Sequence, residues 1–223
     1  MNISFEDSHL RQLDIIHPEK LEFNISIIGG GAIGSFSALA LAKMGCQKIT
    51  VWDDDTVETH NIGNQLSGVS DIEKPKTYSI NRILKNLCGL KIKQEKRKYL
   101  GQELTPGVVI VGSDNMISRK IAFENVSKSK SKIDFFIDGR MGAEFLRIYS
   151  FNPFKKEFVE RYLKTLYSDE EAEDLPCSGR SIIYCPFIIA GIICSIVKKF
   201  AKEEMTPFEI LFDIKKNLFL SKE

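Results

Sequence analysis

Four residues near the N-terminus have the types and spacing of a nucleotide-binding site. Gly29, Gly31 and Gly34 fit the pattern G-x-G-x-x-G, in which glycines allow a tight turn and let backbone N–H groups approach a phosphate. Asp53 follows the last glycine by about 20 residues, where an acidic side chain usually holds the hydroxyls of a nucleotide ribose. The stretch therefore predicts nucleotide binding.

A strand, a helix and a second strand must position these residues. The apolar run 25–28 predicts a buried strand, and 48–52 predicts another that leads directly into Asp53. Between them, residues 32–44 predict a helix that begins with Ala32 and Ile33 and ends at Gly45, a residue suited to a helix C-cap. Alone, this β-α-β unit fits a dehydrogenase about as well as any other nucleotide-binding protein.

A second polar group lies at the end of another predicted strand. The run 107–111 is apolar and ends in Gly112, Ser113, Asp114 and Asn115. Ligands of open parallel sheets bind beyond the carboxyl ends of the strands, at the point where the strand order reverses. Asp53 and Asp114 are therefore expected at the same edge of the sheet. Asp114 suits a metal ion and also suits the N-cap of a helix at 115–126, and the two roles are compatible.

The rest of the chain predicts a Rossmann-like α/β domain, with a doubly wound, mostly parallel sheet and antiparallel C-terminal strands. A helical lead-in occupies residues 1–24 and is broken by Pro18, and residues 25–223 form a single nucleotide-binding domain. The further expected elements are a helix at 76–87, an edge strand at 90–97, a strand at 133–137, an antiparallel strand-like stretch at 144–161, a long crossover-type loop at 163–178, an apolar helix at 182–200 and two short strands at 208–212 and 217–220.

Composition excludes several classes of protein. A net charge of +1 over 223 residues gives no basic surface for nucleic acid or membrane. The five cysteines include no C-x-x-C pair, so no zinc is expected. The polar N-terminus lacks a signal peptide, and a reducing cytoplasm is the expected setting. The apolar run 182–197 is shorter than the roughly 20 residues of a membrane span and contains Pro186, which predicts a buried helix.

Taken in order, the motifs resemble the ThiF/MoeB family of adenylyltransferases, which are related to ubiquitin-activating enzymes. The resemblance covers residues 9 to 205 approximately, and a dehydrogenase would not need this arrangement of Asn61, Lys76 and Asp114. It rests on Arg11-Gln12, Gly29-x-Gly31-x-x-Gly34, Asp53-x-Asp55-x-Val57, Asn61, Gln65, Pro75-Lys76 and Ser113-Asp114-Asn115.

The resemblance implies carboxylate activation with ATP and Mg²⁺. The C-terminal carboxylate of a ubiquitin-like or sulfur-carrier protein that ends in glycine attacks the α-phosphate of ATP. Pyrophosphate leaves, and an acyl-adenylate remains. Charge builds around the phosphates in the transition state, so positive groups and a metal are needed there.

The same resemblance assigns roles to individual residues. Lys76 would neutralise phosphate charge, Asp114 would hold Mg²⁺ and Asp53 would bind the ribose. Asn61 would help to place the phosphates, and Arg11 would reach the nucleotide of the partner subunit across a homodimer. The other residues implied beside the nucleotide are Gly29, Gly31, Ala32, Ile33, Gly34, Asp55, Asn64, Gln65, Ser113 and Asn115.

The sequence departs from the family at one position and leaves one step open. Asn64 stands where the family commonly has an arginine that stabilises phosphate charge, and a neutral amide cannot supply that Coulomb interaction. Arg140, expected just beyond the strand at 133–137, is a candidate to substitute for it. Cys177 lies in the long loop, in a Pro-Cys setting that resembles family members that form a thioester. Cys185 and Cys194 are expected in the core.

Three alternatives remain at this point. A catalytically weak family member would bind nucleotide and need a partner subunit to complete its site, and Asn64 favours that alternative. A nicotinamide-dependent oxidoreductase is favoured only by the glycine loop and Asp53. A tRNA-modifying member of the same superfamily is a third, although no basic domain supports it.

Overall fold

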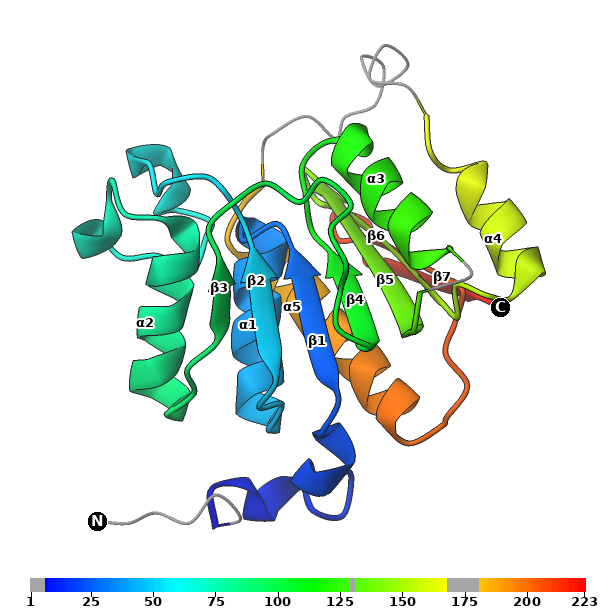
Figure 1. The fold of residues 1–223 in the computed structure, drawn as a ribbon, viewed down its shortest axis with the longest axis horizontal. Helices are drawn as coiled ribbons and strands as arrows, with labels where there is room; N and C mark the ends of the chain where they lie inside the picture. The colour runs from blue at the N-terminus through cyan, green and yellow to red at the C-terminus, as the bar shows by residue number, and fades with distance from the viewer. Residues whose placement is uncertain (1–6, 129–130, 168–180) are drawn as a thin grey trace.

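A computed structural model describes residues 7–128, 131–167 and 181–223. One sheet of eight strands runs through the molecule in the order β3-β2-β1-β4-β5-β6-β7-β8 (Figure 1). The first five strands in this order are parallel and the last three pairings are antiparallel, as the sequence predicts. The strands are β1 (Asn24–Ile28), β2 (Ile49–Trp52), β3 (Lys93–Glu95), β4 (Gly107–Val111), β5 (Ile133–Gly142), β6 (Phe145–Phe151), β7 (Glu209–Asp213) and β8 (Leu218–Lys222).

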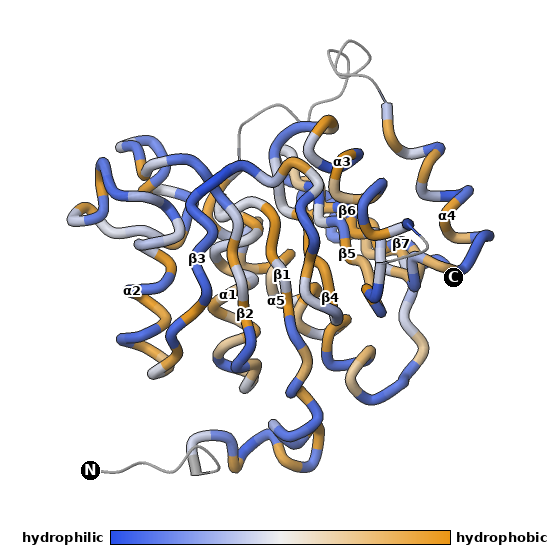
Figure 2. The backbone as a smooth tube through the Cα atoms, viewed as in Figure 1, coloured by the Kyte–Doolittle hydropathy of each residue, from blue (hydrophilic) through white to orange (hydrophobic). Residues whose placement is uncertain are grey.

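Helices cover both faces of the sheet and bury two apolar cores. The helices α1 (Ala32–Met44), α2 (Lys76–Cys88) and α5 (Tyr184–Ala201) supply one core, and α3 (Met116–Val126) and α4 (Lys156–Leu163) supply the other. Strand β4 is apolar throughout and β1 is apolar apart from Asn24 and Ser26 (Figure 2), and both strands are buried, except for Asn24, because both of their faces are covered. The prediction of a doubly wound α/β fold is confirmed.

Local sequence explains where these helices begin and end. Gly45 and Gly89 end α1 and α2 in the left-handed conformation, with φ of 114° and 68°, and glycine adopts this conformation without strain. Asn115 begins α3, and its side-chain oxygen accepts a hydrogen bond from Ser118 N at 2.8 Å. The N-cap role expected around Asp114 therefore belongs to its neighbour, which leaves the Asp114 carboxylate available for other ligands.

The N-terminal segment consists of two short 3-10 helices, Asp7–Gln12 and Pro18–Leu21. It packs at the end of α1 that lies away from the glycine loop, where Gln12 Nε2 donates to Met44 O at 2.7 Å. Helix α1 has 13 residues and is therefore about 20 Å long. Arg11, which is exposed, consequently lies far from the glycine loop of its own chain.

Two expected boundaries are wrong. Strand β5 does not end at Ile137 but continues to Gly142, because Asp138 to Gly142 pair in register with β6. The stretch 144–161 is not a single strand-like segment, because β6 ends at Phe151 and α4 begins at Lys156. Phe158 and Tyr162, four residues apart on α4, face the second core, where Phe158 stacks on Phe208 at 5.4 Å between ring centroids.

Among the described residues, α5 is the one helix that is long and apolar enough, by length and composition alone, to cross a membrane. One face of α5 packs along α1 and over the sheet, with Phe187 tilted on Phe36 at 4.6 Å between ring centroids. Ile189, Ile193 and Val197 on this face are fully buried. This packing is that of a core helix.

The segment between β2 and α2 is held in place by a buried ion pair. Asp71 is fully buried and accepts hydrogen bonds from Arg82 Nε at 2.9 Å, Arg82 Nη2 at 2.5 Å and Gly68 N at 2.9 Å. Burial alone would raise the pKa of Asp71, but the bonds from Arg82 and Gly68 lower it to about 2. The pair fixes residues 68–71 against α2, and so supports the preceding segment, which carries Asn64 and Gln65.

This pKa predicts how stability changes in acid. A carboxyl group whose pKa is lower in the folded state stabilises the protein above its unfolded pKa, and this contribution disappears as the pH falls through the folded value. From about pH 4 to pH 2, the wild-type chain should therefore lose about 2 kcal/mol that an Asp71→Asn variant does not lose. Urea unfolding of both proteins at several pH values measures this. A stability difference that stays constant down to pH 2 would contradict it.

Candidate nucleotide-binding site

Two loops meet where the strand order reverses. Strands β1 and β4 are neighbours, and the loops that follow them are in direct contact. Gly29 has a φ of 93°, and a Cβ atom there would lie 3.0 Å from Gly112 C and Ser113 N. The contact requires glycine at position 29 and brings the glycine loop against Ser113 and Asp114. Asp53 follows β2 and Asp114 follows β4, and both strands run parallel to β1 as its neighbours, so the prediction that the two residues lie at one edge of the sheet is confirmed.

The first turn of α1 is open to an anion. Gly31 occupies the N-cap and has no side chain to cap the helix, and no acidic residue lies in the first turn. A Cβ at Gly34 would lie 1.8 Å from Gly29 O, so only glycine lets the loop fold back on the helix. The free N–H groups and the helix dipole together suit phosphate oxygens.

Asp53 lies beside this loop. Its Oδ2 accepts a hydrogen bond from Gly30 N at 2.6 Å, and its Oδ1 accepts one from Asp55 N at 2.9 Å. Burial raises the pKa of Asp53, while Lys76 and these backbone donors oppose the rise. The carboxylate therefore shapes the loop that a ribose would contact, at the position that the sequence predicts.

Lys76 is directed back toward the end of β2. Its Nζ lies 2.6 Å from Asp55 Oδ2, its backbone N donates to Asp55 O at 3.0 Å, and its side chain is only 11% exposed. The burial of the side chain and the ion pair with Asp55 restrict where the ammonium can move. Lys76 thus places one positive charge close to the Asp53–Asp55 segment.

The segment 58–67 lies over the first turn of α1. Leu66 N donates to Ser35 Oγ at 3.1 Å, which ties the segment to the helix. Asn61 is buried, and its Oδ1 accepts from Glu58 N at 2.9 Å, so Asn61 shapes the turn itself. Gln65 Nε2 lies 4.0 Å from the Cβ position of Gly31. Ser35 was missed by the sequence analysis, since a serine inside a predicted helix gives no signal.

Asn64 contacts the segment that leads into α5. Its Nδ2 donates to Ser181 Oγ at 3.2 Å. The buried oxygens of the Asn64 and Gln65 amides have no hydrogen-bond partner among the described residues. Two unpaired acceptors beside the glycine loop suit donors on a ligand, such as ribose hydroxyls or an amino group.

Asp114 is exposed, and its Oδ1 accepts a hydrogen bond from Asn115 Nδ2 at 3.0 Å. An exposed carboxylate beside a phosphate-binding loop fits Mg²⁺, which usually takes one or two protein carboxylates and completes its shell with phosphates and water. Asp53, Asp54 and Asp55 form a second acidic group, with oxygens within 4.8 Å of one another. There, however, Asp53 is occupied by backbone donors and Asp55 by Lys76.

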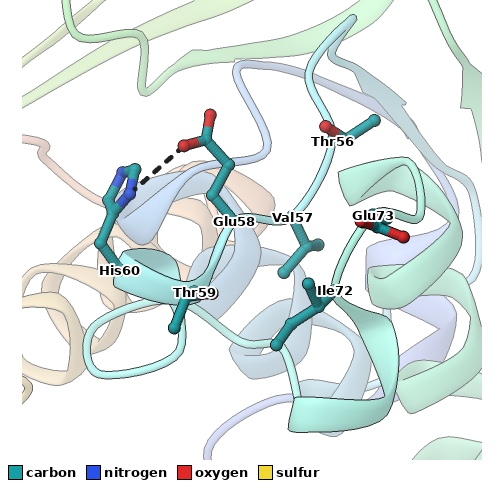
Figure 3. Close-up of a pocket in the computed structure, with 7 residues that line it drawn as sticks. All are labelled: Thr56, Val57, Glu58, Thr59, His60, Ile72 and Glu73. Carbon is teal, nitrogen blue, oxygen red and sulfur yellow. Dashed lines mark ion pairs between the residues drawn. The ribbon is translucent and has the colours of Figure 1, made fainter.

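A shallow hollow of about 590 Å³ opens on the outer side of the same segment. Figure 3 shows the pair Glu58–His60, with Nδ1 and Oε2 3.4 Å apart, at one side of this hollow and Ile72 and Glu73 at the other. The residues that line it are Thr56, Val57, Glu58, Thr59, His60, Ile72 and Glu73. None of them is a residue that the sequence assigns to the nucleotide.

Arg140 does not project beyond a strand end as expected, because β5 continues past it. Its guanidinium is 11% exposed, and each of its nitrogens already has a partner. Nε donates to Asp138 Oδ2 at 2.7 Å, while Nη1 and Nη2 donate to Thr165 O and Oγ1 at 2.9 and 3.0 Å. Arg140 therefore belongs to a buried cluster and does not replace the missing arginine at Asn64.

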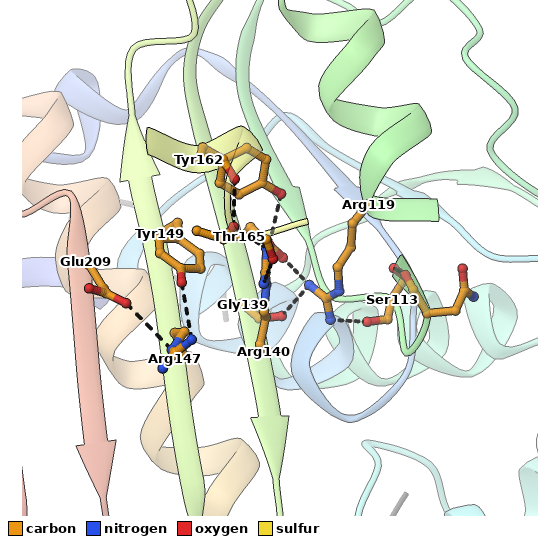
Figure 4. Close-up of polar contacts among 11 residues, drawn as sticks. Ser113, Arg119, Gly139, Arg140, Arg147, Tyr149, Tyr162, Thr165 and Glu209 are labelled. Carbon is orange, nitrogen blue, oxygen red and sulfur yellow. Dashed lines mark hydrogen bonds and ion pairs between the residues drawn. The ribbon is translucent and has the colours of Figure 1, made fainter. Parts of the chain in front are cut away.

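Arg119 is a further residue that the sequence analysis missed. It lies on the apolar face of α3 with Ala122, Phe123 and Val126, and is only 4% exposed. It donates hydrogen bonds to Asp138 Oδ1, to Gly139 O at 2.9 Å and to Ser113 O (Figure 4). The sequence did contain a signal for its burial, because Arg119 recurs at helical spacing with the apolar residues of α3.

Arg11 is not brought to the site of its own chain, because it lies at the opposite end of α1. Cys177 lies outside the described residues. Burial raises the pKa of the Cys46 and Cys185 thiols, and raises that of Cys194 to about 12. These thiols are therefore protonated at neutral pH and unsuited to nucleophilic attack.

Comparisons with known proteins agree with this geometry. The sequence matches the model of the ThiF family over residues 11–199. No curated protein matches it. Similar solved structures are PaaA (TM-score 0.72, 15% identity, covering 97% of this chain and 69% of that one) and E. coli MccB with AMPCPP and MccA (TM-score 0.73, 18% identity, covering 92% and 65%). E. coli MccB has also been solved with ATP. The chain spans about two thirds of the length of these proteins, and at such identities the likeness shows a shared fold.

Proposed function

This chain belongs to the ThiF family, and on that premise we propose that it uses ATP and Mg²⁺ to adenylate the C-terminal carboxylate of a small protein or peptide. The observation that supports the proposal most strongly is the contact between the glycine loop and the Ser113–Asn115 loop, with Lys76 directed to the same edge of the sheet. Phosphate-binding N–H groups, a positive charge and a metal-type carboxylate are what phosphoryl chemistry requires.

Each described residue then has a distinct part in the reaction. The N–H groups at the start of α1 bind phosphate oxygens, and Asp53 orients the ribose. Lys76 stabilises the charge that accumulates on the phosphates as pyrophosphate leaves. Asp114 holds Mg²⁺, which supplies Lewis-acid stabilisation of that charge when bound.

The substrate is proposed to be either a ubiquitin-like or sulfur-carrier protein that ends in glycine, or a short peptide. The resemblance to ubiquitin-activating enzymes supports the carrier. The likeness to MccB, whose structures contain MccA, supports the peptide. Both substrates present the same nucleophile, a free carboxylate at the end of a mobile chain. A later thioester on Cys177 and a cytoplasmic location are part of the proposal for the carrier.

ATP–pyrophosphate exchange by the purified chain tests the proposal. Exchange that requires Mg²⁺, a carrier or peptide and an intact Asp114 would establish adenylation. ATP binding without exchange under every condition would favour the alternative of a weak member that needs a partner subunit, for which Asn64 is the supporting feature. Binding of a nicotinamide dinucleotide in place of ATP would contradict the proposal, since the nicotinamide alternative leaves Lys76 and Asp114 without a role.

We further propose that the active form is a homodimer, in which Arg11 reaches the nucleotide of the partner subunit. The position of Arg11 supports this, since it lies about 20 Å from the glycine loop of its own chain. The exposed apolar side chains at and just before the start of α5, Ile182, Ile183, Tyr184 and the outer part of Phe187, offer a surface that a second copy would cover.

Mixing two inactive variants tests the dimer directly. Arg11→Ala and Asp114→Ala should each lower exchange by about 100-fold or more, because each lacks one group that contacts the phosphates. A mixed dimer has one site with both residues intact, so the mixture should recover about a quarter of the wild-type rate. Mixing Asp114→Ala with Lys76→Ala is the matched control. Both residues belong to the site of the same chain, so no site in this mixture is intact and no recovery is expected. Absence of recovery in the first mixture would contradict the arrangement in trans.

A further inference from the structure

A buried ionic cluster lies directly beneath the loop that carries Asp114. It consists of Arg119 on α3, Asp138 and Arg140 on β5, Tyr162 on α4 and Thr165 just after α4 (Figure 4). Asp138 is fully buried and is the centre of the cluster, because it accepts hydrogen bonds from Arg119, from Arg140 Nε at 2.7 Å and from Tyr162 Oη at 2.9 Å. Burial alone would raise the pKa of Asp138, but the two guanidinium groups hold it below its ordinary value, so the carboxylate is ionised.

Arg119 occupies an unfavourable place for a structural arginine. It lies in the first turns of α3, where the helix dipole is positive, and its side chain is only 5% exposed. A buried cation at this end of a helix is stable only with a charged partner and satisfied donors. Asp138 is that partner. The cluster therefore fixes Arg119, and the remaining donors of its guanidinium are free to fix something else.

The second partner of Arg119 is the carbonyl of Ser113, in the peptide unit that leads into Asp114. A trans peptide is planar, with its N–H antiparallel to its C=O. Because the Ser113 carbonyl is held toward Arg119, the Asp114 N–H is directed away from the buried cluster. The backbone at Asp114 therefore has a defined orientation, although its side chain is exposed.

We propose that Arg119 is a positioning residue, held by Asp138, that orients the Ser113–Asp114 peptide so that the Asp114 carboxylate can bind Mg²⁺ at the nucleotide. This inference rests on the proposed function and identifies Arg119 as the residue that positions the metal ligand Asp114. Arg119 touches neither metal nor nucleotide. Its effect is therefore expected on the coupling between Mg²⁺ and ATP and not on binding of ATP alone.

Two matched substitutions separate positioning from structural support. Arg119→Lys and Arg140→Lys each keep a positive charge beside Asp138 and remove one guanidinium. A single ammonium cannot reproduce a fork of donors, so Arg119→Lys cannot hold both Asp138 and the Ser113 carbonyl. Arg140 has no contact with the 113–115 loop among the described hydrogen bonds, so Arg140→Lys leaves that loop held.

The measurement is the dissociation constant of ATP by calorimetry, with excess Mg²⁺ and with EDTA. In the wild-type chain Mg²⁺ should tighten ATP binding, and Asp114→Ala should abolish the effect. Arg119→Lys should reduce the Mg²⁺ effect by about fivefold or more, with little change in EDTA, whereas Arg140→Lys should keep it within about twofold. The melting temperatures of both Lys variants should fall by similar amounts.

The outcomes distinguish this inference from the proposed function. Equal Mg²⁺ effects in the two Lys variants would overturn the positioning role of Arg119 and leave the proposed function intact. A wild-type chain that binds ATP with no Mg²⁺ effect, or does not bind ATP, would overturn both. If Arg119→Lys does not fold, Asp138→Asn is the second variant. It removes the charge that fixes Arg119 and must lower the same Mg²⁺ effect for the inference to stand.

Discussion

Replacing Lys76 with alanine should lower the rate of ATP–pyrophosphate exchange by two to three orders of magnitude. Removing one charged donor from a preorganised site typically costs about 100- to 1,000-fold in rate. The loss should be especially large here, because Asn64 supplies no charge at the family's arginine position and Lys76 carries more of the stabilisation. Loss of the ion pair should change stability little, since Asp55 is 64% exposed and such pairs contribute about 0–1 kcal/mol; any further loss comes from the packing of the Lys76 side chain, which is 11% exposed.

Lys74 provides the control for this prediction. It lies two residues earlier, donates to Ser70 O at 2.7 Å and is exposed, so Lys74→Ala makes the same chemical change outside the site. Rates and urea unfolding curves of both variants, measured side by side, separate catalysis from folding. Equal rates in the two variants would show that Lys76 is an ordinary first-turn lysine.

Replacing Asp138 with alanine should cost about 3–5 kcal/mol of unfolding free energy. The change removes the only anion among the described residues of the buried cluster and leaves the guanidinium groups of Arg119 and Arg140 without a counter-charge. Breaking a buried ion pair by removing one partner has this magnitude because the other charge stays desolvated. The midpoint of urea denaturation should therefore fall sharply.

Asp134→Ala is the matched control, because Asp134 lies on the same strand but its side chain is exposed. We expect its unfolding free energy to stay within about 0.5 kcal/mol of wild type. A loss of less than about 1 kcal/mol in Asp138→Ala would mean that water or rearranged side chains satisfy the two arginines.

The sequence was sufficient for the parts of the fold in which local and long-range preferences agree. Helix α1 has the predicted bounds of 32–44, since a glycine loop precedes it and Gly45 ends it. Strand β4 is a continuous apolar run, and β1 carries three isoleucines among its four buried residues, as burial on both faces requires. Their adjacency followed from the topology of doubly wound sheets, and so did the meeting of Asp53 and Asp114 at one edge.

The errors arose where tertiary contacts decide. Residues 138–142 contain Asp138 and Arg140, which look like the start of a loop, and only pairing with β6 and the cluster behind it keep them in a strand. Phe158 and Tyr162 are residue types that favour strands, but here they pack against Phe208 and Phe151 from one face of a helix. Such packing overrides strand propensity. The role of Arg119 could not be predicted, because its partners are 6, 19 and 20 residues away in sequence.

The packing of α5 on α1 also has a consequence for how the chain is made. The glycine loop and α1 are complete once residue 44 has been synthesised, but the element that packs most extensively on α1 is α5, which ends at Ala201. Ribosomes add about 5–20 residues per second, so the surface of α1 that α5 covers stays open for about 10–30 s of translation. During that time α1 exposes apolar side chains, and the nucleotide site is not yet formed. A chaperone that shields apolar segments at the ribosome exit should therefore raise the yield of folded protein more than added ATP does.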